Sequence, residues 1–313
     1  MRYVIKKIIT MLVTLLALTF VVFFAFHIIS GDPAVSLLGT QATPERVEAL
    51  REEMGLNDPV LLQYLRWAGS FVTGDMGMSY SYRMPVSEMI AGKIPITLVL
   101  TIMAFVMMLL ISIPLGIYTA KHKDSYGDRV ILLWNQVIMA VPPFFMGILF
   151  TFLFGLVLKL FTPGGYVSYE KNVGAFLSYL IFPALAIALP KAGMAVKLLR
   201  SSVIEETRMD YVRTAYSKGN RTNAVLYGHV LKNAVIPVIT FWGMAFADMI
   251  TGSIIIEQVF NIPGLGRLLL TSISNRDYPV VMAVMVFFAF VVLLSNLVVD
   301  LLYPLVDPRI SLR

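Results

Sequence analysis

The 313-residue sequence contains no cysteine and only three histidines. Without cysteine there can be no disulfide, no thiol chemistry and no cysteine-ligated metal site. His27, His122 and His229 lie in different segments and lack the spacing of a metal site. No G-x-x-x-x-G-K-[ST] segment occurs, and the GLG at 264–266 lacks the rest of a nucleotide fingerprint. The sequence therefore predicts no metal or cofactor bound by this chain.

Charge is also scarce. Charged residues make up 14% of the chain and hydrophobic residues 58%, which leaves too little charge to cover a soluble domain of this length. The apolar residues form long runs rather than stripes, and such runs indicate membrane spans of about 20 residues. We expect an all-α polytopic membrane protein with six spans, at 8–29, 95–120, 130–158, 177–199, 236–257 and 279–303. The first run is too long for a signal-peptide core and has no clear cleavage site, so it is predicted to be retained.

The lysines and arginines predict the orientation, because basic residues gather in cytoplasmic loops. Fourteen lie in four segments that would share one side, namely 1–7, 121–129, 200–234 and 307–313. Only four lie in the opposite short loops, 159–176 and 258–278. Both termini are thus predicted to be cytoplasmic, and the net charge of +6 reflects orientation rather than a nucleic-acid partner. The predicted parts are a stub with the first span (1–29), an extracytoplasmic insert (30–94), a five-span core (95–303) and a cytoplasmic tail (304–313).

The insert is predicted to be helical. Thr43 and Pro44 form a typical helix start, and Gly55 a typical end. A second, amphipathic helix is expected from Asp58, and its apolar residues available for packing are Leu61, Leu62, Leu65, Trp67 and Phe71. This helix either lies on the membrane surface or belongs to a docking platform for an external partner.

The polar segment 200–234 contains the stretch DYVRTAYSKG (210–219). Met209, Val212 and Tyr216 recur at helical spacing beside Ala215, which predicts an apolar stripe. Gly219 is a plausible helix end, and a second short helix is expected from near Thr222, with Val225, Leu226 and Val230 on its apolar side. The pattern indicates either a basic loop that fixes topology or a helix that fits a groove on a partner.

This stretch resembles the coupling loop of the inner-membrane permeases of ATP-binding-cassette importers, in the dipeptide, oligopeptide and nickel branch. Arg213, Thr214, Ala215 and Gly219 occupy the places of the family's Glu-Ala-Ala pattern and its glycine. The proline that ends the general pattern would fall at Lys232, whereas this chain has Pro237, and the first (B-type) permease of the peptide-importer pair is similar in this respect. Further stretches that resemble that subunit are ISGDPAVSLLG (29–39), MGLNDPVLLQYLRW (54–67), GDMGMSY (74–80), IIIEQVFNIPGLGRLLL (254–270), NRDYPVV (275–281) and NLVVDLLYPLVDPRI (296–310).

The resemblance implies the type I importer permease fold and a non-catalytic subunit of a bacterial or archaeal cytoplasmic membrane. It also implies a sister C-type permease, two ATPase subunits that bind ATP and Mg, and an extracytoplasmic binding protein. The residues that would couple to the ATPase are Asp210, Tyr211, Arg213, Thr214, Ala215, Lys218 and Gly219. The expected cargo is peptide, with nickel or a nickel chelate as the alternative. A stand-alone ion-coupled carrier is the alternative from another class.

Two further sets of residues are candidates. An ionised carboxylate at mid-membrane costs about 2.5–3.5 kcal/mol. Asp248, with Met244 and Gly252, is therefore expected to line the cargo path, where it would favour a positive group. The alternatives for Asp248 are a hydrogen bond to a neighbouring span or a protonated carboxyl.

The second set lies at the end of the same span. It either forms an outer gate or a docking site, or it only shapes the loop. It comprises Glu257, Pro263, Gly264 and Gly266. Lys159, Lys191 and Lys197 are expected near span ends, and Gly243 and Gly252 at close helix contacts.

Overall fold

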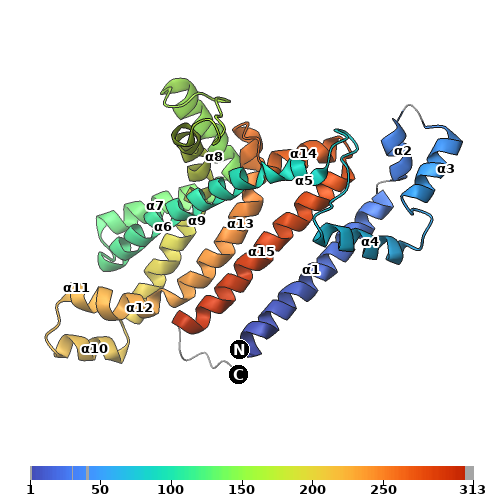
Figure 1. The fold of residues 1–313 in the computed structure, drawn as a ribbon. Helices are drawn as coiled ribbons and strands as arrows, with labels where there is room; N and C mark the ends of the chain where they lie inside the picture. The colour runs from blue at the N-terminus through green and yellow to red at the C-terminus, as the bar shows by residue number, and fades with distance from the viewer. Residues whose placement is uncertain (1, 30, 40–41, 307–313) are drawn as a thin grey trace.

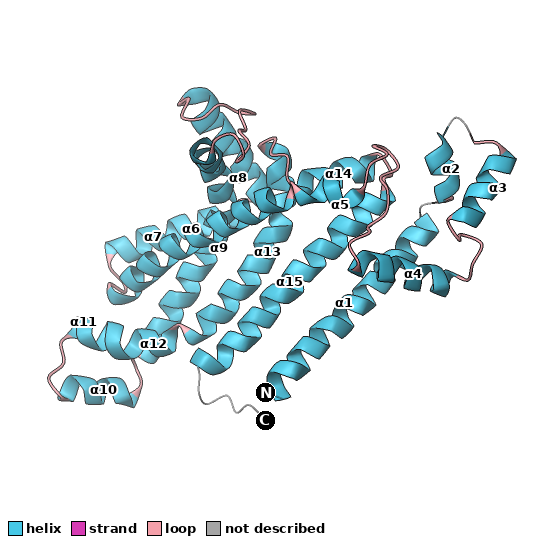
Figure 2. Ribbon diagram, in the orientation of Figure 1, coloured by secondary structure: helices cyan, strands magenta, loops and turns pink. Residues whose placement is uncertain are grey.

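The computed structural model describes residues 2–29, 31–39 and 42–306. These residues form helices joined by loops, with no named strand and only an isolated antiparallel bridge between Met78 and Pro85 (Figure 2). The chain is therefore a polytopic all-α protein, as predicted.

Among the described residues, five helices are long and apolar enough to cross a membrane by themselves. They are α1 (Arg2–Ile29), α6 (Ile94–Lys121), α9 (Val173–Glu206), α13 (Ile236–Val259) and α15 (Tyr278–Val306). Five of the six predicted spans are thus confirmed. Helix α9 continues beyond the predicted end at 199, so the polar segment is shorter than expected. Helix α15 reaches into the predicted tail, of which residues 307–313 lie outside the described part.

The predicted span at 130–158 is not one continuous helix. This region contains α7 (Tyr126–Ala140), α8 (Pro143–Phe150) and a π-helical segment, η2 (Thr151–Val157), and its two halves meet at a bend of 102°. Pro142 and Pro143 cause the break, because each lacks a backbone N–H and disfavours a helical residue before it. Val141 is accordingly extended, with φ −88° and ψ 121°.

The predicted outer insert consists of α2 (Pro33–Leu38), α3 (Pro44–Glu53), α4 (Val60–Val72) and α5 (Val86–Ala91). Thr43 caps α3 as predicted, since its hydroxyl accepts from the N–H of Arg46 at 3.4 Å. Helix α4 begins after Pro59, two residues later than predicted, without a side-chain cap.

The buried side of α4 follows the prediction only in part. Trp67 and Phe71 pack as expected, with Trp67 against Phe23 of α1. Leu61, Leu62 and Leu65 are exposed, whereas Tyr64 is buried against Phe20 and Phe23 of α1. The hydroxyl of Tyr64 lies 3.0 Å from that of Thr19, so α4 is fixed to α1 by an aromatic contact rather than by its leucines.

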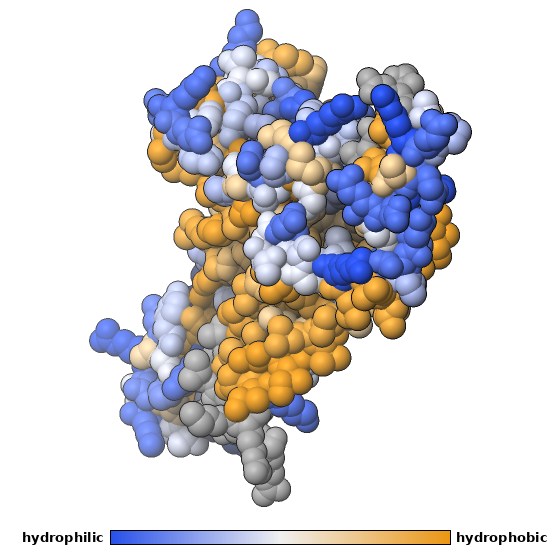
Figure 3. All heavy atoms as spheres, turned by 45° about the vertical axis from the view of Figure 1, so that its right-hand side comes forward, coloured by the Kyte–Doolittle hydropathy of each residue, from blue (hydrophilic) through white to orange (hydrophobic). Residues whose placement is uncertain are grey.

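The remaining elements are α10 (Asp210–Ser217), α11 (Thr222–Val225), η3 (Leu226–Val230), α12 (Leu231–Ala234) and α14 (Leu265–Ser274). In Figure 1, α10 to α12 and the start of α1 occupy the lower part of the view, α2 and α3 lie at the upper right, and α4 lies below them beside α1. The main core lies where α6 packs along α9, with Leu100 and Met108 against alanines of α9 such as Ala184 and Ala188. Figure 3 shows an apolar band between two hydrophilic ends.

Candidate functional site

The first candidate site is the polar hairpin, which we define as α10 to α12 (210–234). Helix α10 starts after Met209, whose backbone is extended (φ −70°, ψ 148°), and Asp210 adds a negative charge to its first turn. That charge suits the positive end of the helix dipole. Because α9 extends to Glu206, only residues 207–209 separate the hairpin from this long span.

Two apolar side chains attach α10 to the rest of the molecule. Val212 and Ala215 are buried and pack in one cluster with Leu199 and Val203 of α9. Val225, Leu226 and Val230 join this cluster from the second half of the hairpin, as predicted.

The remainder of the predicted stripe on α10 is wrong, because Met209 is 43% exposed and Tyr216 45% exposed. Met209 precedes the first helical turn, and Tyr216 projects about 100° around the axis from Ala215.

A hydrogen-bond network holds the start of α10. The hydroxyl of Tyr211 donates to Glu206 at 2.7 Å, and the amide of Asn233 donates to Glu206 at 3.2 Å and to the Tyr211 oxygen at 3.1 Å. Burial, followed by the hydrogen bond to Glu206, raises the pKa of Tyr211 to about 12. The network therefore ties the end of α9, α10 and α12 together with the phenol protonated at neutral pH.

The opposite side of α10 is open and polar. Asp210, Arg213, Thr214 and Lys218 are all exposed. The guanidinium of Arg213 lies 3.8 Å from the Asp210 carboxylate, but so exposed a pair contributes little to stability. The structure thus gives these four predicted coupling residues no internal packing role, and their contact with an ATPase stays a prediction.

Gly219 reverses the chain between the two halves of the hairpin. Its φ is +82°, a left-handed conformation that side-chain-bearing residues rarely adopt, and a Cβ there would meet nothing within 4 Å. The amide of Asn220 donates to the carbonyl of Ala215 at 3.1 Å. Gly219 is therefore required by backbone conformation rather than by lack of space.

The hairpin packs on the ends of three long helices. Its cluster includes Ile117 of α6, Leu199 of α9 and Val238 of α13. Nearby, Arg200 of α9 holds Asp128 of α7 with two hydrogen bonds of 2.8 and 2.7 Å. A displacement of α10 would therefore act on α6, α9 and α13 together.

The second candidate site is one face of α13. Met244, Asp248, Thr251 and Ile255 are exposed at intervals of four, three and four residues, which places them on one side of the helix. Gly252 is partly buried beside them, and a Cβ there would meet nothing within 4 Å, so the predicted close helix contact does not form within this chain. Gly243, by contrast, directly faces Val299 of α15.

Asp248 forms an ion pair with Lys191 of α9, with its carboxylate oxygen 2.6 Å from the ammonium nitrogen. Lys191 was expected near the end of a span, but α9 runs from Val173 to Glu206 and places it in the interior. The side chains remain 24% exposed for Lys191 and 63% for Asp248. Asp248 therefore pairs with a neighbouring span and is still open on one side, while its place on the cargo path stays a prediction.

The third candidate set lies at the other end of α13. Glu257 is fully buried, and its carboxylate accepts from the hydroxyl of Thr97 at 2.6 Å and from the N–H of Arg267 at 3.1 Å. The carboxylate thus caps α14, whose first N–H groups have no helical partner. A Cβ at Gly264 would lie 2.5 Å from this carboxylate.

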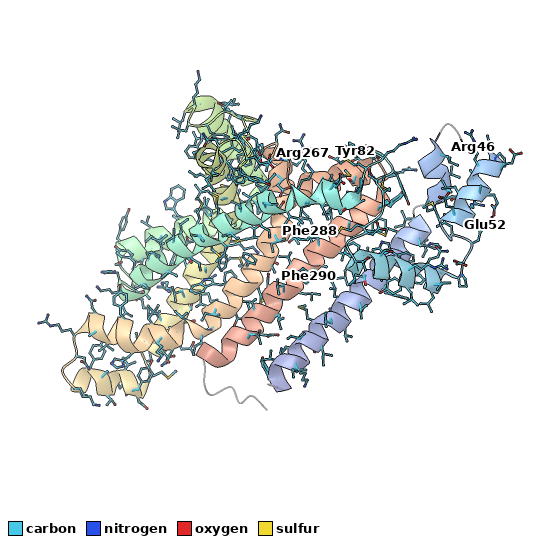
Figure 4. The ribbon with its side chains drawn as sticks, in the orientation of Figure 1. Arg46, Glu52, Tyr82, Arg267, Phe288 and Phe290 are labelled. Atoms are coloured by element: carbon cyan, nitrogen blue, oxygen red, sulfur yellow. The ribbon has the colours of Figure 1, made fainter. Side chains whose placement is uncertain are left out.

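A Cβ at Gly266 would meet both the Glu257 carboxylate and the backbone of Ile254. Pro263 precedes the capped turn. This geometry accounts for the two glycines, while a gating or docking role of the set stays a prediction. Figure 4 shows Arg267 and Tyr82 at the same upper edge of the molecule, and Arg46 and Glu52 of α3 projecting farther out.

A second buried carboxylate connects two stretches that are distant in the sequence. The buried carboxylate of Asp277, just before α15, accepts from the Ser79 hydroxyl, from the N–H of Tyr80 at 3.0 Å and from that of Ser81 at 3.3 Å. Burial raises the pKa of Tyr80 to about 12. The segments GDMGMSY and NRDYPVV are therefore partners in space.

Sequence reasoning missed the roles of Lys191, Thr97, Asp277 and the Asp128–Arg200 pair. Lys191 carried a usable signal, because it stands well inside an apolar run that also contains Pro183 and Pro190. The other residues gave none, since a threonine or a loop aspartate reveals its partner only when the helices are packed.

Comparisons with known proteins agree with this architecture. The family model "Binding-protein-dependent transport system inner membrane component" matches residues 112–312, and its companion for the N-terminal part of such membrane components matches residues 1–101. The oligopeptide transport system permease protein AppB of Bacillus subtilis is 37% identical over 312 residues, covering 99% of both chains.

Two other relatives are similar over their whole length. A probable peptide ABC transporter permease of Sinorhizobium fredii is 32% identical, covering 98% of both chains. The glutathione transport system permease protein GsiC of Salmonella paratyphi A is 35% identical, covering all of both chains. The chain therefore belongs to the family of inner-membrane components of binding-protein-dependent transport systems.

Proposed function

We propose that this chain is a permease subunit of an ATP-driven importer that forms part of a path for peptides. In this proposal it works with a sister permease, two ATPase subunits and an external binding protein, and both of its termini are cytoplasmic. The chain itself performs no chemistry, and ATP and Mg bind to the ATPase subunits.

The polar hairpin is the observation that carries this proposal. Val212 and Ala215 hold α10 to the ends of the long helices, while Arg213 and its exposed neighbours point away from them. Such a helix fits a groove on a partner. A loop that only fixed topology would need basic residues but neither a buried face nor the Tyr211 network.

The mechanism follows from this packing. Closure of the ATPase subunits on ATP displaces α10, and the shared cluster passes the displacement to α6, α9 and α13. The exposed face of α13 then opens to one side of the membrane or to the other. Asp248 lies on this face, with Met244 beside it, and lines the path for the cargo.

Peptide is favoured over nickel because the relatives named above transport peptides, oligopeptides or glutathione according to their names. Membership in the family of binding-protein-dependent systems also favours the importer over a stand-alone ion-coupled carrier.

The test is ATP-driven uptake in proteoliposomes that contain this chain, the sister permease and the ATPase subunits, with the binding protein outside. We expect peptide uptake that requires both ATP and the binding protein, and co-purification of the subunits in mild detergent. Uptake driven by an ion gradient without the ATPase subunits would contradict the proposal.

A further inference from the structure

The ion pair between Lys191 and Asp248 lies in the middle of two apolar helices, α9 and α13. The pair rests on one contact of 2.6 Å between the ammonium nitrogen and one carboxylate oxygen. Among the described residues, no other side chain or N–H group donates to this carboxylate. A carboxylate can accept about four hydrogen bonds and a lysine ammonium can donate three, so their mutual contact accounts for only a small part of what either group can bind.

A second ion pair on the same helix is built differently. Arg200 grips Asp128 through both carboxylate oxygens, and the N–H of Asp124 donates to the same carboxylate at 2.9 Å. The side chain of Asp128 is 2% exposed, against 63% for Asp248. The Asp128 carboxylate is enclosed and accepts three hydrogen bonds, as expected of a structural pair, whereas the Lys191 pair is open on one side.

Hydrocarbon does not suit the open side of the Lys191 pair, because charged groups within a span normally face a cavity or a protein. The neighbours on this face of α13, Met244 and Thr251, are exposed as well. The open ion pair and its exposed neighbours are both consistent with a water-containing path between this chain and a partner permease.

Opening the pair has a cost when nothing replaces it, because the side of each charge that faces α9 and α13 is then left without a partner. A zwitterion removes this cost, since its ammonium satisfies Asp248 and its carboxylate satisfies Lys191. A peptide with both ends free has these two groups. A peptide blocked at one end leaves one protein charge unpaired.

We propose that Lys191 and Asp248 form an exchangeable ion pair that selects cargo with a free amino terminus and a free carboxyl terminus. Asp248 binds the peptide ammonium and Lys191 the peptide carboxylate while the cargo passes, and the two side chains pair again afterwards. This inference rests on the proposed peptide import and adds to it the chemical class of peptide.

The test compares uptake of one peptide in three forms, namely free, N-acetylated and C-amidated, by the reconstituted importer. Every variant is measured with the same binding protein, so the preference of that protein cancels when ratios are compared between variants. We expect Asp248→Asn to raise uptake of the N-acetylated form relative to the free form by about tenfold, the effect of one hydrogen bond to a charged group. Lys191→Met should raise uptake of the C-amidated form similarly.

The matched control is the pair of Lys7 and Asp300, which joins α1 to α15 at 2.7 Å. Lys7→Met and Asp300→Asn should change uptake of all three forms by one common factor. The double variant Lys191→Met/Asp248→Asn leaves no unpaired charge and should discriminate least among the three forms. It replaces a single variant in the test if that variant fails to assemble.

If the Lys191 and Asp248 variants, including the double variant, changed the uptake of all three peptide forms by one common factor, the inference would be overturned. Peptide import itself would still stand. Absence of ATP-driven uptake of every form by the unmodified importer would instead contradict the proposed function.

Discussion

At the residue scale, the cap on α14 shows how one carboxylate determines the residues around it. Glu257 fills the space beside Gly264 and Gly266 and satisfies the N–H of Arg267. The sequence analysis predicted loop geometry at these glycines, whereas Gly266 lies in the first turn of α14. It could not predict that they make room for a buried carboxylate, because Glu257 and Thr97 are 160 residues apart.

Gly266→Ala should therefore destabilise the protein. The added Cβ would press on the backbone of Ile254, which cannot rotate away, and such overpacking costs about 1–3 kcal/mol. The measurement is the thermal unfolding midpoint of the purified protein in detergent. Gly252→Ala is the control, since a Cβ there meets nothing within 4 Å and should leave the midpoint unchanged or higher. A Gly266→Ala protein as stable as the control would refute this explanation of the cap.

Tyr211→Phe tests the network at the start of α10. Loss of the hydroxyl removes its hydrogen bonds to Glu206 and Asn233 and should cost about 1 kcal/mol, seen as faster hydrogen exchange in 207–217. Because the folded state raises the pKa of Tyr211 to about 12 from 10.0, its contribution is complete below pH 10 and declines as the pH rises from 10 to about 12. The difference between variant and wild type should hence be constant from about pH 6 to 9. Equal exchange rates in the two proteins would contradict the network's role.

At the element scale, proline had different effects in different helices. Pro142 and Pro143 break the third apolar segment, whereas α9 continues through Pro183 and Pro190, both of which are buried. Two adjacent prolines remove consecutive donors and force Val141 to be extended. A single proline can be tolerated where packing against α6 stabilises the helix on either side of it. The adjacent prolines are visible in the sequence, but the continuity of α9 through Pro183 and Pro190 was not predictable, because it depends on tertiary contacts.

The prediction at this scale concerns Gly219, at the turn of the hairpin. Gly219→Val should uncouple ATP hydrolysis from uptake, because a left-handed conformation costs an ordinary residue about 1–2 kcal/mol and a β-branched residue is stiffer still. The ratio of peptide imported to ATP hydrolysed measures this effect. Gly228→Val is the matched control, since Gly228 is exposed in η3, does not have a positive φ and has no atom within 4 Å of a Cβ. If both variants retained the normal ratio, the turn would not matter for coupling.

At the scale of the whole molecule, an apolar band separates two hydrophilic ends (Figure 3). Long apolar runs predicted this arrangement and five of the helices, because crossing a bilayer imposes length and composition on a single segment. Contacts between segments were not predictable in the same way. Lys191 with Asp248, and Ser79 with Asp277, meet only because the helices pack with a particular rotation and height.

The molecule also leaves surfaces that a single chain does not cover. Helix α1 packs on α15 and α4 along one side, yet many of its apolar residues are exposed, Leu12, Val13 and Leu16 among them. The open face of α13 carries Asp248. Lipid suits the first surface and a protein-lined path suits the second, so the two differ in the environment they require.

Contact between α10 and an ATPase subunit is the most direct test of the proposed coupling. The sequence has no cysteine, so Arg213→Cys supplies a single thiol on the open side of α10. Lys171→Cys supplies one at an exposed position in the loop before α9. Each variant is labelled with a thiol-reactive photocrosslinker, assembled with the ATPase subunits and illuminated. We predict cross-linking to the ATPase subunit from position 213 and none from position 171. The proposed contact would be contradicted by an assembled complex in which position 213 fails to cross-link to the ATPase subunit, or in which position 171 cross-links equally well.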